Sequence, residues 1–283
     1  MTDGAAHRRP ESAAEGRLAA IGRAPEAPFD LAEAALMLAS LDRPRVPLER
    51  YRQHLADLAG AVAGERETRE SAAGRARALA AVIRDAEGYS GDELTYDDLQ
   101  NANLIRVIDR RRGLPVALGI LYVHAARAQG WHAFGLNFPG HFLVAVECGA
   151  ERVILDPFAG IPLGGASDLR AMLKAVAGNG VELTPACYAP LDDRRVLLRL
   201  QNNIKTRLAA QGRFAEAVAA AERMLLIVPE ETSLHRDLGL YHAEAGNLGA
   251  ALDALQRYLD LAEDDEARHD AAALVQRIRA RLN

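Results

Sequence analysis

The stretch that decides the fold is GLNFPGHFLVAVECGAERVILDPF, residues 135–158. Apolar and β-branched residues on both sides of Gly149 predict two antiparallel strands joined by a tight turn. His141 lies on the first predicted strand and Asp156 on the second. Side chains on one face of such a pair lie roughly 4.5–8 Å apart, so we expect the imidazole to hydrogen-bond to the carboxylate. A histidine oriented by an aspartate is the arrangement of a general base.

The nucleophile that would complete a catalytic triad is missing from its expected place. A thiolate is best activated in the first turn of a helix, where the helix N-terminus lowers the pKa of the thiol and an imidazole takes its proton. The helix predicted in LPVALGILYVHAARAQG opens at Pro115, and Val116 and Ala117 follow it. None of these side chains can attack a carbonyl.

Neither of the two cysteines is a suitable substitute. Cys148 follows His141 by seven residues on one predicted strand, so the two side chains point to opposite faces. Cys187 lies in the predicted linker ELTPACYAP, and its spacing does not bring it to His141, so we expect an inert thiol. A lone histidine on a strand is more often structural than catalytic, and an aspartate before a proline often begins a turn. A purely structural contact is therefore the competing interpretation of the pair.

Composition indicates an ordinary globular protein of two domains, with 283 residues of which 49% are hydrophobic and 26% charged. A net charge of -5 predicts no nucleic-acid partner, and we interpret the densest basic run, residues 110–112, as a solvated helix boundary. No apolar run is long enough to cross a membrane. Residues 1–28 are predicted to be a flexible leader without a secretion signal.

The cysteine and histidine spacing gives no sign of a disulfide framework or a metal site. Two cysteines without a CxxC pair favour a reducing compartment, so we expect a cytoplasmic protein. The remaining histidines lack the spacing of metal ligands, and no phosphate-binding or dinucleotide motif occurs. The sequence therefore predicts no metal and no cofactor.

The C-terminal part of the chain contains an internal repeat. Gly212 in QGRFAEAVAAAERML and Gly246 in AGNLGAALDALQRYL stand 34 residues apart, and the small residues Ala217 and Ala251 follow at the same offset. This period is typical of tetratricopeptide repeats. We expect helices over 196–210 and 231–245 to open two repeat units, a final helix to cap them, and the short array to pack on the first domain.

Five blocks of sequence follow one another in the order of a known family. They are NANLIRVIDRRRGLPVALGILY, GLNFPGHFLV, ILDPFAG, LLRLQNNIKTRLAAQGRFAEAV and HRDLGLYHAEAG. With these blocks the chain resembles the SirB-type family, in which a transglutaminase-like domain precedes tetratricopeptide repeats. The resemblance implies an α+β, papain-like domain over 29–190, built of a helix and an antiparallel sheet, followed by a short all-α solenoid over 191–283.

The resemblance also bears on the chemistry. The wider superfamily uses a cysteine on a helix, then a histidine and an aspartate on strands, and His141 and Asp156 match the last two positions. The nucleophile position falls at 115–117, and SirB-type proteins typically lack the cysteine. The resemblance therefore implies a domain without inherited cysteine chemistry.

Two functional hypotheses follow. In the first, a non-catalytic scaffold binds a protein or peptide through the repeats and through a groove where an active cleft would be. The residues predicted to line this groove are Asn101, Asn103, Arg112, Pro139, Gly140, His141 and Asp156. In the second, the chain is an amide or peptide hydrolase or an acyltransferase, in which His141 oriented by Asp156 activates water.

Overall fold

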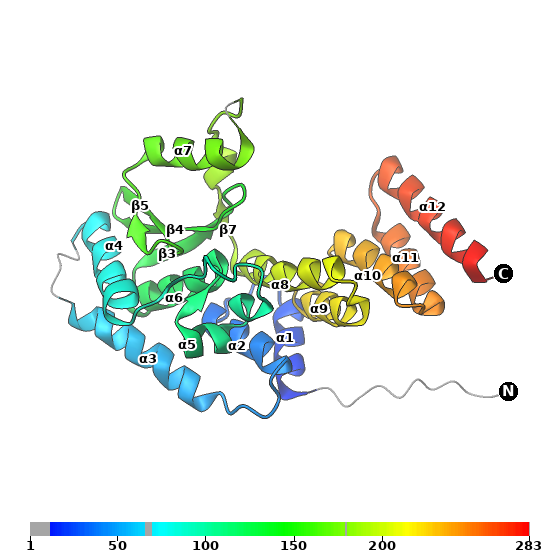
Figure 1. Cartoon of the computed structure of the whole chain (residues 1–283), viewed down its shortest axis with the longest axis horizontal. Coiled ribbons are helices and arrows are strands. Elements are labelled where there is room, and N and C mark those ends of the chain that lie inside the picture. The colour runs from blue at the N-terminus through cyan, green and yellow to red at the C-terminus, as the bar shows by residue number, and fades with distance from the viewer. Residues whose placement is uncertain (1–11, 66–69, 179, 283) are drawn as a thin grey trace.

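The computed structural model describes residues 12–65, 70–178 and 180–282, which form an α/β part followed by a row of helices (Figure 1). The described part of the chain begins with four helices. They are α1 (Ala13–Arg23), α2 (Leu31–Leu41), α3 (Glu49–Gly64) and α4 (Ala72–Ala80). Asp30 caps α2 as its sequence position suggests, because its side chain accepts a hydrogen bond from the backbone N–H of Glu33 at 2.9 Å.

The prediction of a flexible leader over 1–28 is wrong for α1. Ser12 and Glu15 form a reciprocal capping box at its start, and Leu18 is completely buried. The helix packs against α9 (Phe214–Ile227) of the repeat region. A short amphipathic helix with its own cap is ordered here because a distant part of the chain covers its apolar side. Residues 1–11 of the predicted leader lie outside the described residues.

The middle of the chain connects these helices to the sheet through short elements. They are the π-helix η1 (Ala81–Ala86), β1 (Ser90–Gly91), the 3₁₀ turn η2 (Leu99–Ala102), α5 (Leu104–Arg110), β2 (Arg112–Gly113) and α6 (Pro115–Ala128). Helix α4 thus continues directly into the π turn η1. Helix α6 opens at Pro115 as predicted and is buried nearly all round.

The five-stranded antiparallel sheet has the order β6-β5-β4-β3-β7. Its strands are β3 (His132–Leu136), β4 (Leu143–Cys148), β5 (Glu151–Asp156), β6 (Ile161–Pro162) and β7 (Pro190–Leu191). Val144 and Val146 of β4 pack with α6, whereas Leu143 and Ala145 pack with α7 (Ala166–Ala177) on the other face. Alternation along a strand thus sandwiches the sheet between α6 and α7 (Figure 1).

The repeat region confirms the predicted helical array. Its elements are α8 (Asp193–Ala210), α9, α10 (Thr232–Glu244), α11 (Leu248–Leu261) and α12 (Asp265–Leu282). Gly212 and Gly246 have φ values of +71° and +81°, which glycine adopts without strain at the turns between paired helices. This conformational requirement explains why glycine recurs at the period that the sequence shows.

The boundary expected at residue 190 does not separate two cores. Leu197 and Leu200 of α8 belong to the same buried cluster as Leu36 of α2 and Leu121 of α6. The predicted linker contributes β7, which pairs with β3 at the sheet edge. The repeats therefore pack on the α/β part, as expected. Within the described ranges, no helix combines the length and the apolar character needed to cross a membrane.

Candidate functional site

The loop between β3 and β4 carries His141. The backbone N–H of His141 donates to the carbonyl of Phe138 at 3.1 Å and closes a tight turn over Pro139 and Gly140. Gly140 has a φ of +66°, and a Cβ at this position would collide with Val176 of α7. His141 thus lies two residues before β4 begins, not within the strand as expected, because the turn ends the extended conformation.

The structure brings His141 and Asp156 together. Val144 pairs with Leu155 in the sheet, so the end of β5 lies beside the residues that precede β4. His141 Nε2 lies 2.9 Å from Asp156 Oδ1, and the two side chains are 17% and 13% exposed. An ionised carboxylate only accepts hydrogen bonds, so this geometry assigns a proton to Nε2 of His141.

Asp156 is held as a carboxylate by the turn that follows it. Its Oδ1 atom also accepts hydrogen bonds from the backbone N–H groups of Phe158 at 2.8 Å and Ala159 at 3.3 Å. Burial alone would raise the pKa of the Asp156 carboxyl, but the hydrogen bond and charge of His141 and these two N–H groups together lower it. The aspartate is therefore both charged and oriented.

Aromatic side chains that the sequence interpretation did not single out surround the pair. The ring of Phe158 meets the His141 ring edge to face at 6.3 Å, and Tyr96 meets Phe158 at 5.9 Å. Phe158 lies in the ILDPF block and could have been found there. Tyr96 lies far away in the sequence, and only the tertiary structure places it near the histidine.

Tyr122 is a third residue that the sequence interpretation did not single out. It is completely buried on α6, and within the described part of the chain its hydroxyl makes no hydrogen bond. Burial raises the pKa of the Tyr122 phenol; the positive charge of Arg84 opposes that rise, and the negative charges of Asp85 and Asp156 add to it. A neutral phenol on α6 thus lies within electrostatic reach of Asp156.

The first turn of α6 offers no nucleophile to the pair. Pro115, Val116 and Ala117 occupy it, and all three are buried. Cys148 stands at the far end of β4, about 23 Å along an extended chain from His141, and its Sγ donates to the carbonyl of Glu70 at 3.2 Å.

Cys187 lies on the opposite side of the sheet from α6, among residues that pack against α7. Its Sγ lies 3.5 Å from the hydroxyl of Thr184. Hydrogen bonds from the side chain and backbone of Thr184 lower the pKa of the Cys187 thiol. In the described residues, neither thiol forms a hydrogen bond with His141.

The asparagines predicted for the groove are internal hydrogen-bonding groups. Asn101 has no exposed surface; its amide nitrogen donates to the carbonyl of Thr95 at 2.6 Å, and its Oδ1 accepts from Arg110 at 2.8 Å. Asn103 caps α5 and donates to the carbonyl of Ala39 at 3.1 Å. The structure does not bring these two side chains to the pair, because both are needed to satisfy buried backbone groups.

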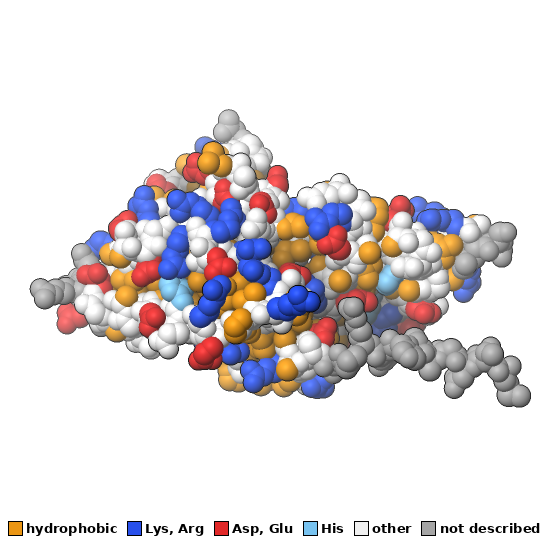
Figure 2. All heavy atoms as spheres, turned by 60° about the horizontal axis from the view of Figure 1, so that its bottom comes forward, with side chains coloured by type: hydrophobic (Ala, Val, Ile, Leu, Met, Phe, Trp, Pro, Cys, Tyr) orange, Lys and Arg blue, Asp and Glu red, His pale blue; other side chains and the backbone are white. Residues whose placement is uncertain are grey.

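The basic run at 110–112 is largely neutralised. Arg110 forms an ion pair with Asp92 at 2.8 Å and Arg111 with Glu87 at 3.0 Å. Arg112 is exposed and donates to the carbonyl of Gly88 at 2.9 Å, so it too lies away from His141. On the face of the molecule drawn in Figure 2, Lys and Arg side chains are interspersed with carboxylates.

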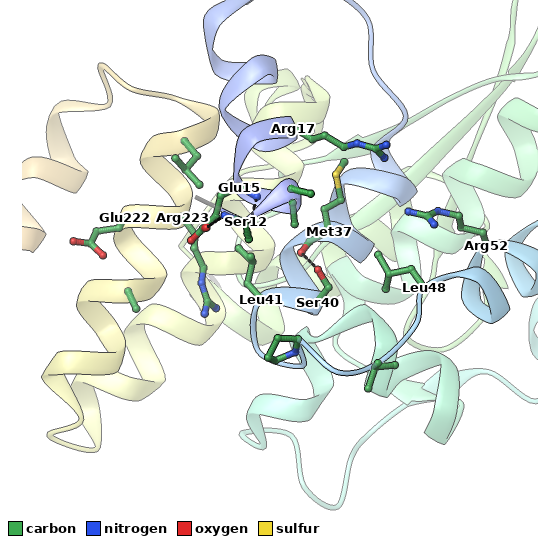
Figure 3. A pocket seen from close by; sticks show the side chains of 16 residues that line it. Ser12, Glu15, Arg17, Met37, Ser40, Leu41, Leu48, Arg52, Glu222 and Arg223 are labelled. Atoms are coloured by element: carbon green, nitrogen blue, oxygen red, sulfur yellow. Dashed lines mark hydrogen bonds between the residues drawn. The ribbon is translucent and has the colours of Figure 1, made fainter. Parts of the chain in front are cut away.

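A cavity lies away from the His141–Asp156 pair. It has a volume of about 890 Å³ and is lined mainly by residues of α1, α2 and α9 and of the segment that follows α2 (Figure 3). Its lining mixes the apolar Met37 and Leu41 with the charged Arg17, Glu222 and Arg223, and it touches neither His141 nor Asp156. Among the described residues, no group of three or more His, Cys, Asp or Glu side chains is placed to hold a metal ion.

Comparison with known protein families identifies a family for each part of the chain. The family described as the transglutaminase-like superfamily matches residues 49–202, more than half of the sequence. The chain belongs to the transglutaminase-like superfamily. A tetratricopeptide-repeat family matches residues 204–283. The expected order of a transglutaminase-like domain and repeats is thereby confirmed.

Relatives of this transglutaminase-like protein occur in several bacteria. A UPF0162 protein of Xylella fastidiosa (strain Temecula1) is 34% identical over 178 residues, which span 62% of this chain and 63% of that protein. A UPF0162 protein of Vibrio cholerae is 28% identical over 244 residues, or 84% of this chain and 88% of the relative. These names do not include SirB, and that finer assignment stays a prediction.

One solved structure matches the chain weakly. It is described as the crystal structure of menin that reveals the binding site for the Mixed Lineage Leukemia protein, and it covers 91% of this chain and 73% of its own with 13% identity. The TM-score is 0.41. At this score the likeness supports no conclusion about the transglutaminase-like protein.

Proposed function

We propose that this transglutaminase-like protein is a non-catalytic scaffold that acts by binding a protein partner. The observation that supports the proposal is the composition of the site: His141 and Asp156 are paired, but Pro115, Val116 and Ala117 fill the first helical turn where a thiol would stand. Covalent catalysis needs a nucleophile within hydrogen-bond reach of its base. Without one, the pair serves to fix the loop that carries it.

The repeats supply the surface for a partner. Tetratricopeptide arrays present a concave face of paired helices to peptides and proteins. The loop residues Pro139 and Gly140 lie beside His141, and we propose that they extend that surface. Both cysteines are free, in agreement with a cytoplasmic location.

The test compares the full-length chain with its His141→Ala and Asp156→Ala variants. Tagged proteins are expressed in the native cell, and captured partners are identified by mass spectrometry. We expect a reproducible partner whose capture is reduced by both variants, because each loses the contact that holds the loop. The deletion of residues 191–283 is not a useful control, since α8 is part of the common core.

The alternative, an amide hydrolase or acyltransferase, is tested on the same proteins. A panel of amide, ester and peptide substrates is incubated with each chain. Turnover by the parent chain that disappears in His141→Ala would overturn the scaffold proposal. Capture that does not differ between the parent and either variant would exclude the loop from the partner surface.

A further inference from the structure

A polar pocket lies where the repeat helices meet the α/β part. It has a volume of about 270 Å³ and is lined by side chains of α8 and α10 together with Asn137 of the His141 loop. Arg195, Arg199, Asn202 and Lys205 line it from α8. Their spacing of four, three and three residues places them on one face of the helix.

Two of the three cations in this pocket have their own countercharges. Arg195 forms an ion pair with Glu231 at 2.5 Å. Lys205, whose side chain is only 5% exposed, forms an ion pair with Asp237 of α10. These pairs link α8 to the start of α10 and to α10 itself, and they compensate the charges of Arg195 and Lys205.

Arg199 is different because all its partners are neutral. Its guanidinium donates to Asn137 Oδ1 and to the backbone carbonyls of Phe138 and His141. No carboxylate lies within ion-pair distance of it in the described part of the chain. Burial lowers the pKa of Arg199, the effect expected when a cation loses water without gaining an anion. An uncompensated, partly buried charge costs free energy that an anionic ligand would recover.

The length and lining of the pocket indicate the kind of anion. Residues 195–205 extend over about 15 Å of helix, which is more than one terminal carboxylate requires. Leu198, Met224 and Leu234 also line the pocket, and together they form one buried apolar cluster. An extended segment with an internal acidic residue next to an apolar one matches both features.

We propose that this pocket binds an acidic peptide segment, with an Asp or Glu carboxylate on Arg199 and an amide contact from Asn202. The inference rests on the proposed function and names the chemical class of its partner. The guanidinium that receives the carboxylate also holds the carbonyl of His141. Occupation of the pocket therefore connects the repeats to the loop that carries the His141–Asp156 pair.

The test uses the full-length chain and an immobilised library of short random peptides. Selected sequences are resynthesised with a fluorescent label, each with Glu or Asp and with the matching Gln or Asn, and with free and amidated C-termini. We expect selected peptides to contain an acidic residue beside a large apolar one, to bind with either C-terminus, to lose affinity in the amide form and to bind more weakly as salt increases.

Variants of the chain test the position of the site. Arg199→Gln removes the charge but also weakens the His141 loop, so a second variant is required. Asn202→Asp adds a carboxylate on the exposed pocket wall, and we expect it to weaken binding about tenfold. Gln211→Glu makes the same change of charge at the other end of α8, outside the pocket, and should bind like the parent chain.

The outcomes separate the two proposals. Selected peptides without an acidic preference, or equal binding by Asn202→Asp and the parent chain, would overturn the anion site and leave a partner-binding role intact. If the selected peptides bind only with a free C-terminus, the pocket recognises a terminal carboxylate instead of an internal one, and the inference as stated is overturned. Failure of the cellular capture described above would count against the proposed function itself.

Discussion

At the scale of residues, one oxygen atom organises the candidate site. Asp156 Oδ1 accepts from His141 and from the backbone N–H groups of Phe158 and Ala159. Such convergence stabilises the charged form of a carboxylate and the local turn at the same time. A structural role needs nothing more, whereas a catalytic role would need a nucleophile near Nδ1.

The lowered pKa of Asp156 predicts a dependence of stability on pH. Because the folded state binds the proton less tightly than the unfolded state, Asp156 stabilises the fold above the unfolded pKa of about 3.9, and this contribution is lost as the pH falls through the folded pKa. At neutral pH, Asp156→Asn should reduce the free energy of unfolding by about 1–3 kcal/mol.

Denaturant unfolding of both proteins from pH 7 to strongly acidic pH checks this sign. The difference in the free energy of unfolding between the parent chain and Asp156→Asn should shrink as the solution becomes acidic. A difference that stays constant, or grows, would show that the ionised carboxylate does not stabilise the loop.

Asn101 offers a second test at this scale. Its buried amide bridges the carbonyl of Thr95 and the guanidinium of Arg110, so Asn101→Ala removes one hydrogen bond from each of these two groups. We expect a loss of about 1–3 kcal/mol in the free energy of unfolding. The exposed Asn202 is the control, since Asn202→Ala should change that free energy by no more than about 0.5 kcal/mol. Equal effects would contradict the internal role of Asn101.

At the scale of elements, the N-terminal helix α1 shows how a short segment is fixed from outside. Its sequence contains a capping box, but a helix of 11 residues is marginally stable alone. Gly22 lets α1 approach the backbone of α9 closely, because a Cβ there would collide with the carbonyl of Leu226. The contact joins a segment before the α/β part to one after it.

Replacement of Gly22 by alanine should therefore separate α1 from α9. We expect Gly22→Ala to lower the free energy of unfolding by about 1–3 kcal/mol through overpacking. Gly60 in α3 is a matched control, since no atom lies near the position of its added Cβ. Gly60→Ala should stabilise the chain by about 0.5–1 kcal/mol. Thermal or denaturant unfolding measures both; a neutral Gly22→Ala would mean that the close approach is not required.

At the scale of the whole molecule, the first repeat helix, α8, packs both in the core of the α/β part and against the next repeat helix, α9. Leu200 of α8 packs in the large cluster shared with α2 and α6, whereas Leu255 of α11 packs in a separate cluster with α12. The array thus has one end anchored in the α/β part and one end held only by its own helices. Local opening should start at the free end.

Two leucine truncations distinguish these ends. Leu200→Ala and Leu255→Ala each remove a fully or nearly fully buried side chain. Each should lower the free energy of unfolding of the region in which the leucine packs by about 2–5 kcal/mol. Hydrogen exchange should show loss of protection in both the sheet and the repeats for Leu200→Ala, and only in α10, α11 and α12 for Leu255→Ala. Identical exchange patterns would contradict the division into two clusters.

Local signals in the sequence determined much of this protein. Pro115 at the start of α6, the hairpin around Gly149 and the glycines at 212 and 246 each act through backbone conformation or side-chain period within a few residues. These features predicted the α+β domain, the repeats and the proximity of His141 to Asp156. Asn101, which the family resemblance placed at the groove, has no exposed surface, because burial depends on neighbours that the local pattern does not contain.

The tertiary structure alone decided the rest. The order of α1 depends on α9, and the neutral surroundings of Arg199 depend on a loop about sixty residues away. A sequence pattern records which residues are apolar or charged, but it does not record which distant group will cover or neutralise them. The fold of the chain could thus be predicted from local periodicity, while the packing of its N-terminal helix and the uncompensated charge in its repeat pocket exist only after distant segments meet.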